Sequence, residues 1–218
     1  HPEHRRRGHG RHLLTSLSQK LAILGPPNLV AEIPAGREAA SAAFSACGWQ
    51  PAGRLTDWRR DARLPSKADP GTASSAREAL APVSFEDLEA AGLLGTGPRC
   101  WQRDLPALAK HRERLAGLAF HSPDRIEAWA LWDEAAVATA PAEEWPLLAL
   151  GAAPGALGRL GLAAVLDELG RLAGRLECNA PLLLPRVAPE ELDADLLREL
   201  GFEPGAEHLL FTSRAQAA

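Results

Sequence analysis

The chain has 218 residues, of which 46% are hydrophobic and 24% are charged, and its net charge at pH 7 is −4. This length suits one large domain or two modest ones, and the composition is typical of a globular protein in water. No apolar run approaches the roughly 18 residues that cross a bilayer. No basic-then-apolar leader opens the sequence, so we expect a cytoplasmic protein without a membrane segment.

The charges divide unevenly along the chain. Residues 1–64 contain ten Lys and Arg against five acidic residues, a net charge of +5, and the remainder carries −9. Such a division indicates an anionic ligand for the first part and a solvated acidic surface for the second.

The first part of the chain predicts alternating helices and strands. Leucines recur at helical spacing from Leu13 until Gly25-Pro26-Pro27 ends the run, and Gly48 closes a second helical pattern. The expected elements are a helix over 9–24, a strand over 28–33, a helix over 36–47 and one or two strands with a Pro/Gly turn over 49–61.

The second part follows a stretch rich in Pro, Ser, Gly and Ala, which we interpret as a linker over 65–79. Ser84 and Asp87 form a capping pattern that predicts the start of a helix. The other expected elements are helices over 105–119, 156–173 and 189–200, and strands over 125–132, 144–152 and 207–213.

The end of the chain resembles its beginning at a constant offset of 153 positions. Gly8 falls on Gly161, and Gly48-Trp49 falls on Gly201-Phe202. Further matches at the same offset are Gly10 with Ala163, Leu13 with Leu166, and Pro51 with Pro204. The shared register predicts an internal duplication.

The opening stretch, HPEHRRRGHGRHLL, excludes several kinds of site. It lacks the G-K-[ST] ending of a Walker A loop, and no apolar strand precedes Gly8 as a dinucleotide fingerprint requires. Its histidines have no carboxylate or Cys partners at ligand spacing, so we expect no metal. A nucleic-acid-binding arm is disfavoured because the cluster is short and the whole chain is acidic.

An anion site at a helix start agrees best with these residues. Gly8 and Gly10 leave room for a ligand to approach the backbone, and the helix beginning there presents free N–H groups and a positive dipole end. The arginines before it add positive charge. The stretch predicts a pyrophosphate site, and the alternative is a solvated basic helix start.

The segment Arg5-x-x-Gly8-x-Gly10 resembles the Q/R-x-x-G-x-G/A motif of the GCN5-related N-acetyltransferases, and residues 37–53 resemble the helix of that family that ends in Gly-Phe and leads into the last strands. The resemblance implies a mixed central sheet flanked by helices, an α/β (α+β) fold, present twice. It also implies that acetyl-CoA, as cosubstrate, binds through its pyrophosphate at the motif. The implied binding residues are Arg5, Arg6, Arg7, Gly8, His9, Gly10 and Arg11.

The chain departs from the family's pattern in three places. The motif lies in the middle of a complete domain of this family, so we expect the front half of the first domain to be absent here, which agrees with the lack of any Met. Many members carry a tyrosine that protonates the departing thiolate, where this chain has Phe44, with Ser45 beside it, and Leu197 in the second copy. The second copy keeps Gly161 and Ala163 but not the leading Arg.

These observations predict a duplicated protein. Residues 1–64 would be the C-terminal half of one acetyltransferase domain, 65–79 a linker, and 80–218 a second, degenerate domain. The expected reaction is direct acetyl transfer from acetyl-CoA to an amine of a small molecule or a protein, by catalytic residues that the sequence does not identify. A non-catalytic CoA-binding or scaffolding protein is the alternative. No nucleic acid or membrane partner is expected, and a homodimer is left open.

Overall fold

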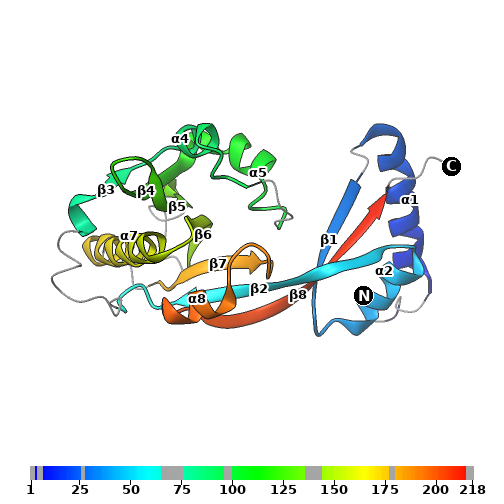
Figure 1. Cartoon of the computed structure of the whole chain (residues 1–218). Helices are drawn as coiled ribbons and strands as arrows, with labels where there is room; N and C mark the ends of the chain where they lie inside the picture. The colour runs from blue at the N-terminus through cyan, green and yellow to red at the C-terminus, as the bar shows by residue number, and fades with distance from the viewer. Residues whose placement is uncertain are drawn as a thin grey trace. The chain divides into compact units, whose positions relative to one another are not determined.

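The computed structural model describes residues 3, 7–25, 28–64, 76–95, 100–135, 144–176 and 180–214 (Figure 1). These residues form a mixed eight-stranded sheet with helices against it, in the strand order β1-β8-β2-β7-β6-β5-β4-β3. The predicted fold class, a mixed central sheet flanked by helices, is confirmed. No helix in the described part of the chain is long and apolar enough to cross a membrane.

The chain forms two compact units, one of His1–Leu55 with Ala206–Ala218 and one of Thr56–Gly205. Two long strands, β2 (Gln50–Arg60) and β8 (Glu203–Arg214), contribute to both units. The division at 65–79 stays a prediction, since residues 65–75 lie outside the described residues. The boundary between the two compact units lies within the two shared strands.

The first unit is a helical layer on a short sheet. It contains α1 (His9–Leu24), β1 (Asn28–Pro34) and α2 (Glu38–Ala46), as predicted to within two residues. The C-terminal strand β8 runs antiparallel to β1, from Asn28 opposite Arg214 to Pro34 opposite His208. The last strand of the chain therefore completes the unit that the first residues begin.

The core of the first unit explains this pairing. Leu29 and Ile33 of β1 alternate toward the same buried cluster as Trp49 and, from β8, Phe211. Gly48 ends α2 with a φ of 83°, a left-handed conformation that favours glycine. The Gly48-Trp49 pair therefore turns the chain and then supplies a buried ring.

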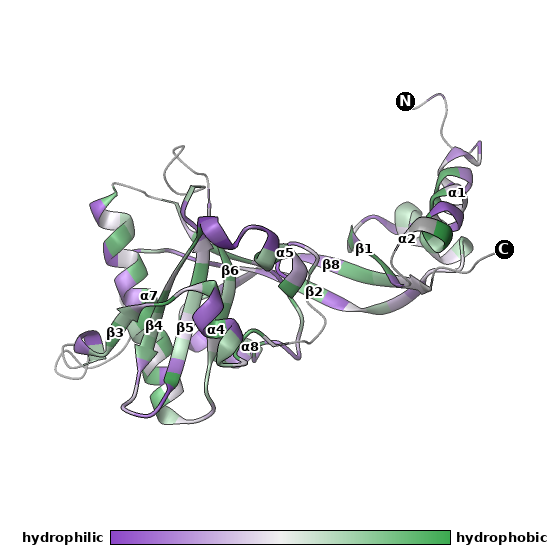
Figure 2. Cartoon of the chain, turned by 90° about the horizontal axis from the view of Figure 1, so that it is seen from above, coloured by the Kyte–Doolittle hydropathy of each residue, from purple (hydrophilic) through white to green (hydrophobic). Residues whose placement is uncertain are grey.

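The second unit has a sheet buried on both faces. It contains β3 (Leu80–Pro82), β4 (Leu115–His121), β5 (Ile126–Asp133), β6 (Trp145–Ala152) and β7 (Leu182–Val187). Neighbours from β3 to β6 are antiparallel, whereas β6 and β7 are parallel. Figure 2 colours β6 mainly as hydrophobic, as expected for a strand covered on both sides.

Helices cover each face of this sheet with a separate core. Ala128 and Ala130 of β5 pack with α7 (Ala156–Arg175) and α8 (Ala194–Glu199), and Trp129 and Leu131 lie in the cluster of α4 (Phe85–Ala90) and α5 (Leu105–Lys110). The period of two along β5 thus divides the side chains between the two layers.

Three helices are shorter than predicted. The prediction of one helix over 105–119 was wrong. The helix α5 ends at Lys110, a 3₁₀ turn η2 (Arg112–Arg114) follows it, and β4 begins at Leu115. Gly117 lets the backbone of β4 lie against Val83, whose carbonyl oxygen would be 2.4 Å from a Cβ there. Strand pairing therefore overrides a spacing that also fits a helix.

Caps determine where the other two short helices begin. Ser84 and Asp87 form the predicted capping box, and α4 continues only to Ala90. The helix expected from 189 begins instead at Ala194, because the carboxylate of Asp193 accepts hydrogen bonds from Asp195 N–H and Leu196 N–H. Residues 50–60 form one continuous strand, so the turn expected near Pro51 and Gly53 was wrong.

Glu168 of α7 makes the stability of the second unit depend on pH in the acid range. Its carboxylate contacts Arg171 at 2.7 Å, Arg175 at 3.3 Å and Arg77 at 3.6 Å. Burial raises the pKa of Glu168, but the hydrogen bond from Arg171 and the three positive charges outweigh it, so the net pKa is lowered.

A lowered pKa in the folded state stabilises the fold above the pKa of the unfolded chain, and this contribution is lost as the pH falls through the folded-state value. We therefore expect Glu168→Gln to lose stability near pH 7 and to show a flatter dependence below the ordinary value of 4.5. Urea unfolding of both proteins from neutral to acidic pH measures this. Equal slopes in the acid range would contradict the role of the three arginines.

Candidate functional site

The predicted binding residues lie at the start of α1. Arg5 and Arg6 fall outside the described residues, whereas Arg7, Gly8, His9, Gly10 and Arg11 are exposed at the first turn. Gly8 is the N-cap with a φ of 81°, and its carbonyl oxygen accepts a hydrogen bond from His12 N–H at 3.0 Å. Glycine is favoured at Gly8 because this left-handed conformation strains other residues.

The backbone at this helix start is open to a ligand. A Cβ built on Gly8 or on Gly10 would have no atom within 4 Å. No side chain caps the helix and no acidic residue lies in its first turn. The first turn therefore contributes no acidic side chain that would neutralise the free N–H groups and the positive end of the helix dipole. Arg7 and Arg11 add two positive charges beside them.

Contact with α2 holds this end of α1 in place. The Sγ of Cys47 lies 3.9 Å from the carbonyl oxygen of Arg11, and α2 packs beside α1 over the cluster that contains Leu29 and Phe211. The arrangement can bind a doubly charged phosphate group through backbone N–H groups, with arginines beside them. The residues present thus fit the pyrophosphate of a coenzyme.

The corresponding helix of the second unit differs. The N-cap of α7 is Gly155, with a φ of 109°, and Gly161 lies six residues beyond it inside the helix. A Cβ on Gly161 would be 2.5 Å from the ring of Phe120, and one on Gly158 would be 1.9 Å from the carbonyl oxygen of Ala153. Gly161 therefore does not repeat the open position of Gly8, because Gly158 and Gly161 both lie against internal neighbours that leave no space for a side chain.

This difference predicts opposite effects of the same substitution within one helix. We expect Gly158→Ala to destabilise the protein by about 1–3 kcal/mol, because its methyl group has no space beside Ala153. We expect Gly174→Ala, which has open space, to stabilise it by about 0.5–1 kcal/mol through the loss of glycine's backbone entropy. Urea unfolding of both variants tests this. A Gly158→Ala protein as stable as Gly174→Ala would contradict the packing role.

Comparison with known proteins gives matches at the level of structure. No protein family and no curated protein matches the sequence. A GCN5-related N-acetyltransferase from Sphaerobacter thermophilus aligns with 100% of this chain and 71% of its own, at 16% identity and a TM-score of 0.64. A tandem GNAT protein from the clavulanic acid biosynthesis pathway aligns with 100% of this chain and 73% of its own, at 16% identity and a TM-score of 0.61.

The chain has the fold of the GCN5-related N-acetyltransferases. A third structure, a GCN5-related glucosamine N-acetyltransferase region of a fungal multi-domain β-N-acetylglucosaminidase, agrees at a TM-score of 0.65 and 15% identity. It aligns with 97% of this chain and 28% of its own. At 15–16% identity, the similarity to these three structures shows a shared fold and nothing more.

The position that the acetyltransferase resemblance gives to a tyrosine has an apolar side chain packed against or within a hydrophobic cluster in each unit. The ring of half-buried Phe44 lies 5.1 Å from that of Trp49 and 5.9 Å from that of Phe211, and Leu197 of α8 is fully buried. Ser45 is exposed on α2. Neither Phe44 nor Leu197 has a proton to give.

Sequence reasoning did not single out several buried polar side chains. Arg60, Arg103, Glu127 and His208 are the buried polar or charged residues of the described chain. No motif surrounds them, and only their burial distinguishes them from surface charges. Among the described residues, no group of three or more His, Cys, Asp or Glu is placed to hold a metal ion.

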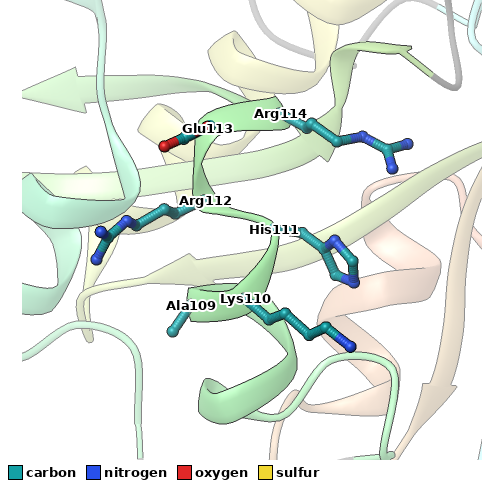
Figure 3. Close-up of a pocket in the computed structure, with 6 residues that line it drawn as sticks. All are labelled: Ala109, Lys110, His111, Arg112, Glu113 and Arg114. Carbon is teal, nitrogen blue, oxygen red and sulfur yellow. The ribbon is translucent and has the colours of Figure 1, made fainter.

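A basic hollow on the second unit does not qualify as a site. Residues 109–114 line it, and Figure 3 shows Lys110, His111 and Arg114 pointing to one side and Arg112 to the other. Arg114 pairs with Asp133 at 2.6 Å, and Arg112 lies 3.7 Å from Glu86. These cations are solvated and paired at the surface, so the hollow offers no organised anion site.

Proposed function

We propose that this protein is an N-acetyltransferase that moves the acetyl group of acetyl-CoA to an amine of a small molecule or a protein. The observation that carries the proposal is the open, basic start of α1 on an acetyltransferase fold. Gly8 and Gly10 leave the first turn accessible, and Arg7 and Arg11 surround it with positive charge. Pyrophosphate is the part of acetyl-CoA that such a helix start binds.

The reaction needs little covalent chemistry from the chain. The amine nitrogen attacks the carbonyl carbon of the thioester, the carbon–sulfur bond breaks, and the products are an amide and the free thiol of CoA. The proton that the amine loses passes to a base or to water, and the thiolate takes up one proton. Positioning of the two substrates and polarisation of the carbonyl by backbone N–H groups supply the rate enhancement.

The second copy predicted from the sequence, residues 80–218, is proposed to support the first copy within a tandem arrangement. One structural neighbour is itself described as a tandem GNAT protein. The first unit includes part of β8, so residues from the end of the chain are needed to complete the sheet on which α1 lies. In this arrangement the second copy stabilises the unit that binds acetyl-CoA.

A non-catalytic CoA-binding or scaffolding protein is the second candidate. Phe44, which packs half-buried against its cluster, and the buried Leu197 stand where many acetyltransferases have a tyrosine that protonates the thiolate. Water or another group can protonate a thiolate, so the reaction is slowed rather than excluded by this change.

A thiol-release assay with acetyl-CoA and a panel of amines separates the two candidates. Turnover supports the enzyme, and a thermal shift with acetyl-CoA but no turnover supports the scaffold. Neither turnover nor a thermal shift would overturn both. Salt-dependent binding to DNA would then favour a nucleic-acid-binding role for the positively charged first part of the chain.

A further inference from the structure

The parallel strands β6 and β7 separate soon after they meet. Their register contains only Trp145 opposite Leu182 and Pro146 opposite Leu183. Beyond these pairs both strands continue, to Ala152 and Val187, so the backbone groups that face the gap need other partners. In open sheets the carboxyl end of such a parallel pair is the usual position of a ligand.

Each strand has an irregularity beside this gap. On β6, Leu147 pairs with Trp132 and Ala149 with Leu131, so Leu148 is the extra residue of a bulge. On β7, Leu184 pairs with Trp58 and Val187 with Thr56, so two residues, Pro185 and Arg186, lie opposite one. Bulges redirect backbone groups out of the ladder.

The second bulge is held in a strained conformation. Arg186 has a φ of 53°, the only positive φ of a non-glycine residue in the described chain. Its N–H donates to the carboxylate of Asp57 at 2.9 Å. A non-glycine residue in this region persists only where its surroundings hold it, so the geometry of the bulge is built into the fold.

The two carbonyl groups beside the gap accept hydrogen bonds from one side chain. The Nε of Arg103 donates to the carbonyl oxygen of Leu148 at 3.1 Å, and its Nη1 donates to that of Pro185 at 2.9 Å. The guanidinium is also paired with both carboxylate oxygens of Glu191. Arg103 is 0% exposed, and the side chain of Glu191 is 6% exposed.

This acceptor set matches the geometry of a guanidinium. A planar fork with donors on three nitrogens can reach one carbonyl on each strand and a bidentate carboxylate at once, whereas an ammonium group cannot. Cys100, also 0% exposed, places its Sγ 3.9 Å from the same Pro185 carbonyl and closes the site from the neighbouring turn.

We propose that the gap between β6 and β7 is a guanidinium-binding site whose occupant is the chain's own Arg103. The side chain acts as an internal ligand that joins the separating strands, so the gap receives no external ligand while Arg103 is in place. The second unit would then be a structural unit with a filled crevice. This inference does not depend on the proposed acetyltransferase activity.

Removal of the occupant tests the site directly. We expect Arg103→Ala to lower the Tm by roughly 10 °C, because Glu191 and two carbonyls lose the hydrogen bonds that Arg103 donates. Millimolar ethylguanidinium should restore a large part of that loss, and ethylammonium, with equal charge but no planar fork, should not. Wild type and Arg112→Ala, whose arginine is exposed, should gain no stability from either cation.

Two outcomes would overturn the proposal: an unchanged Tm for Arg103→Ala, or the same response to ethylguanidinium in wild type and variant. If Arg103→Ala does not fold, side-chain nitrogen-15 NMR of the wild type decides. The Nε hydrogen of Arg103 should exchange with water at least 100-fold more slowly than that of Arg112. Equal exchange rates would refute a held guanidinium. Neither experiment contains acetyl-CoA, so its result is independent of the enzymatic proposal.

Discussion

Replacement of Gly10 with aspartate is expected to weaken acetyl-CoA binding by 10- to 100-fold without destabilising α1. Gly10 is the second residue of the helix, and a side chain there meets no atom within 4 Å. A carboxylate about 5 Å from a phosphate charge is repelled by about 3 kcal/mol near a protein surface, before screening by salt reduces it. Titration calorimetry at two salt concentrations measures the change.

The same carboxylate favours the helix. Aspartate in the first turn interacts favourably with the helix dipole, and the loss of a helical glycine adds to this, so the free energy of unfolding should not fall. The matched control is Gly10→Ala, which adds a side chain without a charge and agrees with the G/A alternative of the motif. We expect alanine to keep affinity within a few-fold of the wild type.

The result distinguishes a ligand site from a solvated basic helix start. If Gly10→Asp binds acetyl-CoA as tightly as Gly10→Ala does, the pyrophosphate is bound elsewhere and the role assigned to Arg7, Gly8 and Arg11 fails. If both variants lose binding and stability together, the effect lies in the fold. Circular dichroism of both proteins separates these outcomes.

Local signals predicted the first unit well. The helix from His9 to Leu24 has leucines at helical spacing and a Gly-Pro-Pro stop, and Gly48 marks the end of α2 by its left-handed conformation. These signals act within a few residues, so the sequence alone contains them. The capping box at Ser84 and Asp87 was predictable for the same reason.

Strand pairing over long distances was not predictable from such signals. The pairing of β1 with β8 joins residues near 30 to residues near 210, and the pairing of β2 with β7 joins residues near 58 to residues near 184. The duplication predicts two successive domains, a division that stays a prediction, and no local signal indicates that β2 and β8 each contribute to both compact units. Alternation within a strand shows which face is buried but not which strand lies beside it.

Side chains with packing roles also misled the sequence reasoning. Gly161 matched Gly8 in register, yet the ring of Phe120 requires the absence of its side chain. Nothing in the local sequence distinguishes Arg103 from a surface charge, whereas its burial and four hydrogen bonds do. In both cases the deciding partner is far away in sequence, so tertiary contacts alone reveal the role.

Arg60 at the end of β2 is expected to be among the most sensitive positions for stability. Its Nε donates to the carbonyl oxygen of Leu200 at 2.8 Å, where α8 ends, and its Nη2 donates to that of Leu64. Nη2 also lies 3.6 Å from the carboxylate of Asp167, and the side chain is 1% exposed. Burial lowers the pKa of Arg60, and the charges of Asp167 and Asp61 raise it by less, so the net pKa is lowered. Keeping this side chain charged in the interior therefore costs free energy.

Arg60→Met is expected to destabilise the protein by about 3–5 kcal/mol, because it removes one partner of a buried, hydrogen-bonded pair. Methionine avoids the cost of burying a charge, but the carbonyl groups of Leu200 and Leu64 and the carboxylate of Asp167 remain without this donor. The free-energy cost of burying these acceptors without this donor exceeds the free energy gained by no longer burying a charge. In urea unfolding the midpoint should fall with an unchanged m-value.

The neighbouring residue supplies the control. Arg59 lies next to Arg60 on the same strand and pairs with Glu144 at 2.7 Å, but its side chain is 43% exposed. We expect Arg59→Met to cost no more than about 1 kcal/mol, because solvent screens a surface ion pair. If the two substitutions cost the same, the buried hydrogen bonds of Arg60 do not stabilise the end of α8. If Asp167→Asn reproduces the full loss, the ion pair rather than the two carbonyl groups carries the effect.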